Sequence, residues 1–175
     1  MTRRLLAGIL GAAFLGSHFV LFPALAVELN TRWGWPRWQS TTSEAIGVVL
    51  ALGALAALGH CATIFRSVGH GTPQPLAPPT HLVVAGLYQY SRNPIYVADV
   101  ALLLAVFLVR GDVTLLLYAL IVTVELHLWI VWREEPVLRR RFGDRYVAYT
   151  QRVPRWLCGR RLTAREEGLT ARRLR

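Results

Sequence analysis

Two apolar runs in this 175-residue chain are long enough to cross a membrane and carry almost no charge. Crossing about 30 Å of hydrocarbon at about 1.5 Å per residue takes roughly 20 helical residues. Leu5 to Val27 and Ala45 to Phe65 reach that length, so both are expected to be membrane-spanning helices. A cleavable signal peptide is the alternative for the first run, although its length exceeds the usual apolar core of about 7 to 15 residues.

A tight helical hairpin is expected in the second half of the chain. Ile95 to Val109 is short for a full crossing, Arg110-Gly111-Asp112 suits a turn, and Val113 to Trp132 is longer. The predicted fold class is therefore all-α. We expect a polytopic membrane helical bundle of four transmembrane helices, the last two as the hairpin, plus a cytoplasmic C-terminal amphipathic segment.

The charges indicate how the chain is oriented. All 20 basic residues are arginine, and 13 of them, with five of the ten acidic residues, lie between Arg133 and Arg175. By the positive-inside rule, both termini are expected in the cytoplasm. Arginine in place of lysine, with many alanines and leucines, suggests a bacterial inner (plasma) membrane protein. Residues 1–66 would hold the first two spans, 67–157 a functional core and 158–175 a basic, disordered tail.

Several function classes are disfavoured by composition. A net charge of +10 suggests nucleic-acid binding only when basic residues cover a folded soluble face, and here they cluster at one end. Cys61 and Cys158 give neither a disulfide framework nor a metal-ligand spacing. No nucleic-acid partner and no metal are therefore expected. Close approach of the second span to its neighbours is expected at its small residues, Gly47, Gly53 and Gly59.

The first polar segment between the spans begins with a proline-rich stretch, from Gly71 to Pro79, which is expected to be an extended strap. Towards the end of the polar segment, Asn93-Pro94 predicts a helix start, with Asn at the N-cap and Pro at the first helical position. The amides of that helix start suit an anionic group such as a carboxylate, which Arg92 could pair with.

The second polar segment carries adjacent carboxylates, Glu134 and Glu135, at the end of the last span. Because adjacent carboxylates repel one another, they need cations, which neighbouring arginines or a cationic ligand could supply. His127 lies two turns earlier and could line a pocket with Glu134 or be structural. Asp99 and Glu125 lie deeper, where they could be functional or could pair with Arg110 or with another polar residue of the helix bundle.

Short motifs follow one another in a fixed order over about half of the chain, from Gly71 to Leu157. They are Gly71-Thr72-Pro73, Leu82-Val83, Gly86-Leu87-Tyr88, Arg92-Asn93-Pro94-Ile95-Tyr96, Glu134-Glu135, Leu138, Phe142-Gly143, Tyr146, Tyr149 and Val153-Pro154-Arg155-Trp156. Together they resemble the isoprenylcysteine carboxyl methyltransferase family, which groups with the phospholipid methyltransferases. Several ordered motifs are far more specific than one.

The resemblance implies an integral membrane methyltransferase that uses S-adenosyl-L-methionine and acts on a lipophilic small molecule among membrane lipids. The chemical groups of this cofactor agree with that: Glu134 and Glu135 could bind its ammonium or ribose hydroxyls, and Tyr88 or Tyr96 could face its adenine or sulfonium. The implied cofactor-binding residues are His81, Leu82, Val83, Tyr88, Arg92, Asn93, Pro94, Ile95, Tyr96, Glu134 and Glu135.

Two departures from the family pattern bear on the acceptor. Asn93 stands where the eukaryotic prenylcysteine enzymes have His in an Arg-His-Pro motif, and Ile130 stands where they have Arg. A carboxylate, an amine or a thiol therefore stays open as the nucleophile, and no catalytic base is assigned. A non-catalytic lipid-binding or scaffold protein of the same fold is the alternative function, and a small transporter that uses Asp99 and Glu125 is a third.

Overall fold

The computed structural model describes residues 16–67 and 81–157. The expected strap at 71–79, the expected tail at 158–175 and the first part of the first apolar run lie outside the described residues. The described part is helical and contains no β-strand, only one isolated bridge between Arg37 and Asp112. An all-α fold is therefore confirmed.

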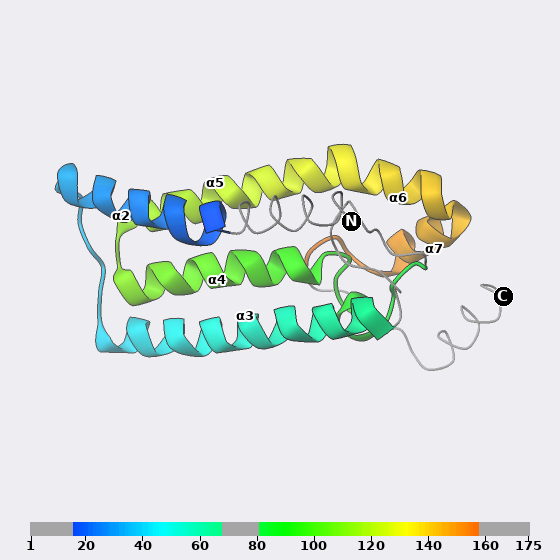
Figure 1. The fold of residues 1–175 in the computed structure, drawn as a ribbon, viewed down its shortest axis with the longest axis horizontal. Coiled ribbons are helices and arrows are strands. Elements are labelled where there is room, and N and C mark those ends of the chain that lie inside the picture. The colour runs from blue at the N-terminus through cyan, green and yellow to red at the C-terminus, as the bar shows by residue number, and fades with distance from the viewer. Residues whose placement is uncertain (1–15, 68–80, 158–175) are drawn as a thin grey trace, which may run out of the picture.

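Four long helical segments lie side by side, and short helices gather at one end (Figure 1). The long segments are η1–α2, a π-helical turn at Ser17–Leu21 running into Phe22–Arg32, then α3 (Thr41–Ser67), α4 (Pro94–Arg110) and α5 (Val113–Trp129). The short helices are η2 (Gly86–Gln89), η3 (Ile130–Glu134), α6 (Glu135–Phe142) and α7 (Asp144–Arg152). We call this end of the bundle the α7 end, and the opposite one the Asp112 end.

Two helices are long and apolar enough to cross a membrane, Thr41–Ser67 and the continuous helix Val113–Phe142. Their apolar side chains are largely unburied: Val49 is 69% exposed, Leu52 63% and Ile121 64%. In water such faces would be costly, whereas lipid tails solvate them. These two spans agree with the expectation. The other two expected spans, in α2 and α4, remain predictions.

Helix α3 packs along α4 with one close approach. A Cβ atom on Gly47 would lie 2.8 Å from Val109 Cγ2 and 2.9 Å from the carbonyl oxygen of Ala105. A Cβ on Gly53 or Gly59 would meet no described atom within 4 Å. The expectation of close contact is therefore right for Gly47 and wrong for the other two, which lie on an open face of α3.

The α4–α5 hairpin turns where the sequence places it. Gly111 adopts φ +74°, and a Cβ there would lie 2.8 Å from the Trp38 carbonyl carbon, so the turn requires glycine. Asp112 is fully buried and accepts hydrogen bonds from Arg37 Nε at 2.6 Å and Arg110 Nε at 3.3 Å. Arg110 therefore pairs with Asp112, and the expected alternative pairing with Asp99 or Glu125 is wrong.

Polar contacts dock α2 on α5 near the Asp112 end. Thr114 Oγ1 donates to the Ala26 carbonyl at 2.6 Å, and the Thr114 amide donates to Asn30 Oδ1 at 3.2 Å. Helix α2 extends beyond the apolar run to Arg32, where Arg32 pairs with Glu28 one turn earlier. Hydrogen bonds of this kind hold helices together where the hydrophobic effect between them is weak.

Each π-helical turn precedes a proline. In η1 the Phe22 amide donates to the Ser17 carbonyl, and Pro23 follows, whereas in η3 the Glu135 amide donates to the Ile130 carbonyl and Pro136 follows. Proline has no N–H and its ring crowds the carbonyl four residues earlier. Widening the preceding turn by one residue relieves that crowding without ending the helix.

Candidate active site

Helix α4 begins at the α7 end as the sequence predicts, with Asn93 at the N-cap and Pro94 in the first turn. The Asn93 side chain does not cap the helix, however. Its Nδ2 donates to the Arg155 carbonyl at 3.0 Å, and Asn93 is buried. Asn93 therefore occupies the expected N-cap position, while its side-chain amide fixes the chain after α7.

The chain after α7 lies across this helix start. The Arg92 amide donates to the Pro154 carbonyl at 2.9 Å, and Ser91 Oγ donates to the Arg155 carbonyl at 3.3 Å. Further on, Trp156 Nε1 donates to His127 Nδ1 at 3.2 Å, with the two rings stacked at 6.1 Å. These bonds tie residues 153–156, α4 and α5 into one unit.

Glu135 lies between two arginines. It accepts from Arg92 Nη1 at 3.1 Å, from Arg155 Nε at 2.7 Å and from Arg155 Nη2 at 3.1 Å. The hydrogen bonds with Glu135 raise the pKa of Arg155 above its already high ordinary value, against the effect of burial. Glu135 is therefore neutralised by the protein itself, which agrees with the alternative that arginines compensate one of the paired carboxylates.

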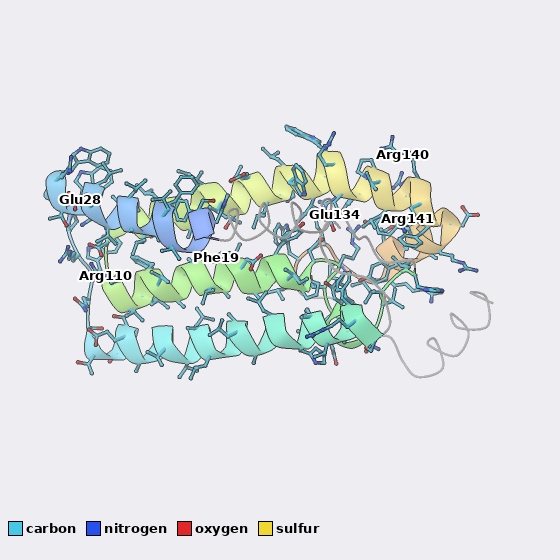
Figure 2. The ribbon with its side chains drawn as sticks, viewed as in Figure 1. Phe19, Glu28, Arg110, Glu134, Arg140 and Arg141 are labelled. Carbon is cyan, nitrogen blue, oxygen red and sulfur yellow. The ribbon has the colours of Figure 1, made fainter. Side chains whose placement is uncertain are left out.

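Glu134, the neighbouring carboxylate, is arranged differently. Its Oε2 atom is buried and has no hydrogen-bond partner in the described structure, while the group interacts with Tyr96 on α4. Figure 2 shows Glu134 at the α7 end, on the side of its helix that faces the start of α4. The Arg92 Nε is likewise buried without a partner. Buried polar atoms are normally hydrogen-bonded, so these two mark where a polar ligand would complete the structure.

The other predicted cofactor residues divide into two groups. Val83 and Tyr88 are buried against Cys61 and Phe65 of α3, with Ile95 packed beside them. Leu82 packs on the cluster under α7, and His81 is exposed. The structure thus brings Arg92, Asn93, Pro94, Tyr96, Glu134 and Glu135 together, places Leu82, Val83, Tyr88 and Ile95 in the packing around them, and leaves His81 exposed.

Tyrosines of α7 join this support. Tyr149 and Tyr146 are buried with Val153, and the Tyr149 hydroxyl donates to the Tyr88 carbonyl at 2.6 Å. Burial raises the pKa of Tyr149 and of Tyr88 well above the ordinary tyrosine value. Both groups are therefore neutral at physiological pH and act as packing and hydrogen-bonding groups.

His127 and Glu125 have other partners than the site residues, whereas Asp99 acts electrostatically on Tyr96. His127 Nδ1 accepts from Trp156, which agrees with the alternative that His127 is structural. The π-turn η3 between His127 and Glu134 adds a residue, which rotates Glu134 off the face of His127. Glu125 is largely exposed, with His18 Nε2 4.0 Å away, and Asp99 is half-buried one turn beyond Tyr96.

Arg155 is the residue that sequence reasoning passed over as a site group. It stands in a motif that carries the family resemblance, Val153-Pro154-Arg155-Trp156, so a signal was present. Its partner could not be read from spacing, because Glu135 lies in a different helix and the chain reverses direction at Gly143. No group of three or more potential metal ligands occurs within residues 16–67 and 81–157.

Comparison with known proteins supports the family resemblance. The phospholipid methyltransferase family model matches residues 37–145, which is more than half of the chain and includes the start of α4 and both glutamates. No curated protein and no solved structure gives a significant match. The chain therefore belongs to the phospholipid methyltransferase family.

Proposed function

We propose that this protein binds S-adenosyl-L-methionine at its α7 end and transfers the methyl group to a lipophilic acceptor at the membrane surface. Membership of a methyltransferase family supports the reaction class. The observation that carries the proposal is the pair of buried, unpartnered atoms of opposite charge, Glu134 Oε2 and Arg92 Nε. A zwitterionic ligand with separated charges would satisfy both.

The residues present fit the cofactor. When bound, it supplies a methyl group on a positively charged sulfur. Glu134 would hold a cationic part of the molecule, the ammonium or the sulfonium, and Arg92 Nε would hold the carboxylate. Tyr96, which interacts with Glu134, would keep the Glu134 carboxylate in place and present an aromatic face to the bound cation.

Glu135 has a different role in this proposal. Because two arginines occupy its oxygens, it orients Arg92 and is not itself a cofactor ligand. The cost of burying the charged Arg92 is lowered by this arrangement, since its Nη1 faces the Glu135 carboxylate. Preorganised charges of this kind hold reactants in register and need no rearrangement on binding.

The acceptor is proposed to be lipophilic because the site adjoins apolar helix faces that no described residue covers. Leu128 and Trp129, on the turn before Glu134, are exposed. A lipid entering sideways from the bilayer would meet this surface first. Ile130 is almost fully buried in η3 and brings no charge to bind an acceptor carboxylate, so an amine or a thiol is favoured over the carboxylate of a prenylcysteine.

Binding of the cofactor to the detergent-purified full chain tests the proposal. Calorimetry with S-adenosylmethionine and with its demethylated product should show saturable binding, lost or strongly weakened in Glu134→Gln. Glu125→Gln is the matched control, because Glu125 is an exposed carboxylate on the same long helix. Binding by the wild type and the control alone would justify a labelled-methyl screen over lipid extracts. No binding by folded protein would overturn the proposal in favour of a lipid-binding or scaffold role.

A further inference from the structure

Acidic and basic side chains of the α6–α7 region point in different directions. Glu134 and Glu135 are turned into the bundle, where Tyr96, Arg92 and Arg155 meet them. Apart from Arg155, the arginines among residues 133–157 are exposed, and Asp144 is the one exposed acidic residue there. We call these exposed arginines the α6–α7 basic face. They are Arg133, Arg139, Arg140, Arg141, Arg145 and Arg152.

Most of these arginines form no salt bridge, although Arg141 lies over the Phe142 ring at 5.6 Å and Arg139 acts electrostatically on Glu135. Arg139, Arg140, Arg141 and Arg145 form no salt bridge with any residue in 16–67 or 81–157. Arg140 and Arg141 belong to the last turn of α6 (Figure 2). Three arginines in one helical turn raise the positive potential at this end of the protein, and that potential attracts anions.

The basic face is held rigidly beside the membrane-spanning helix. Trp129 and Trp132, the last aromatic residues of the apolar run, are 47% and 69% exposed, and the Arg133 guanidinium lies 5.8 Å from the Trp129 ring centre. Exposed tryptophans at such a position are typical of the membrane–water interface. Arg139–Arg141 lie two to three turns beyond, where lipid headgroups would be if these tryptophans mark the interface, and α7 is anchored by its buried tyrosines.

We propose that the α6–α7 basic face binds the headgroups of anionic phospholipids in the bilayer surface. Charge complementarity identifies the partner: cationic side chains just beyond the end of a span attract anionic lipids. A nucleic acid fits less well, because the face adjoins the exposed tryptophans of the same helix. The proposal is independent of methyl transfer, since none of the four unpaired arginines belongs to the candidate site.

Competition between lipids on the full-length protein tests this. The chain is purified in detergent, equilibrated with equal amounts of phosphatidylglycerol and phosphatidylcholine, and the bound lipids are counted by native mass spectrometry. We expect phosphatidylglycerol to be preferred. Replacing Arg139, Arg140 and Arg141 together by Gln should reduce that preference about tenfold or more, whereas replacing all three by Lys should keep most of it.

Arg32→Gln is the control, because Arg32 is an exposed arginine in α2, remote from α6–α7. Circular dichroism checks that every variant keeps its helices. The proposal is overturned if the wild type shows no preference, if the Gln variant keeps it, or if the Lys variant loses it as fully. Displacement of the lipid by excess inorganic phosphate or by RNA would also overturn it, since the face would then be a free-phosphate or nucleic-acid site.

Discussion

Arg155 donates two hydrogen bonds to Glu135, from Nε at 2.7 Å and from Nη2 at 3.1 Å. The pair joins the chain after α7 to the start of α6, and the same Glu135 reaches Arg92 before α4. Three segments that are far apart in sequence therefore converge on one carboxylate. Arg155 also lies outside the segment that matches the family model, which ends at residue 145.

Replacing Arg155 by Gln should release this junction. The Arg155 side chain is 30% exposed, so solvent partly screens the pair, and we expect the free energy of unfolding to fall by about 1 to 2 kcal/mol. Thermal unfolding in detergent measures this. Arg32→Gln, which breaks an exposed pair with Glu28, should cost less than about 1 kcal/mol. Equal effects of the two substitutions would show that Arg155 adds no more than a surface pair.

Tyr149→Phe should destabilise the protein by about 1 to 2 kcal/mol, because the Tyr88 carbonyl then loses the hydroxyl that donates to it at 2.6 Å. Tyr90→Phe is the control, since Tyr90 is exposed. A pH series adds a second readout. Burial raises the pKa of Tyr149 above the ordinary 10.0, so the contribution is complete below about pH 10 and is lost as the pH rises further. The Phe variant should lose stability less steeply above pH 10, and parallel curves would contradict this role.

Helices and their ends were accessible from the sequence, because they depend on local properties. Asn93-Pro94 fixed the start of α4, and Arg110-Gly111-Asp112 fixed the hairpin turn. Apolar length identified α3 and α5. The use of the Asn93 side chain was not accessible, because an asparagine at an N-cap can bond its own helix or a distant carbonyl, and only tertiary packing decides between them.

Gly86→Ala should be destabilising. Gly86 adopts φ +58°, and a Cβ atom there would displace the ends of the Ile64 and His60 side chains of α3. We expect the free energy of unfolding to fall by about 1 to 2 kcal/mol, mainly from backbone strain. Gly53→Ala is the matched control, because a Cβ there meets no described atom within 4 Å. The greater helix propensity of alanine should raise the free energy of unfolding by about 0.5 to 1 kcal/mol. Unfolding of both variants in detergent decides the matter, and a tolerated Gly86→Ala would mean that η2 moves freely against α3.

Asp112→Asn separates stability from function. Asp112 is fully buried and binds Arg37 and Arg110, which are themselves half exposed and can turn to water when it is neutralised. The expected cost is therefore about 1 to 3 kcal/mol, below that of breaking a fully buried pair. Cofactor affinity should not change, because this cluster lies at the opposite end of the bundle from Glu134 (Figure 2). Calorimetry beside thermal unfolding would reveal any coupling between the two ends.

The different partners of Glu134 and Glu135 could not be predicted from the sequence, for a geometric reason. An α-helix turns about 100° per residue, so adjacent residues face different neighbours, and a single extra residue in a turn changes which neighbours those are. Periodicity places Glu134 on the face of His127, but the π-turn breaks that relation. Pro136 was the visible signal, since a proline inside an apolar helical pattern requires a local rearrangement.

Pro136→Ala therefore tests how the site is oriented. Alanine restores an N–H, so η3 can return to α-helical bonding, and α6 would rotate by about 100° relative to α5. Helix propensity would leave the free energy of unfolding unchanged or higher, since proline costs about 3 kcal/mol in a helix interior. Cofactor affinity should nevertheless fall by about tenfold or more, because Glu134 and Glu135 would no longer meet Tyr96 and Arg92 as they do now. Pro23→Ala is the matched control, since Pro23 follows the other π-turn, in the helix before α3, and should leave binding unchanged. A stable Pro136→Ala protein with full affinity would mean that the glutamates reach their partners whatever the register of the helix.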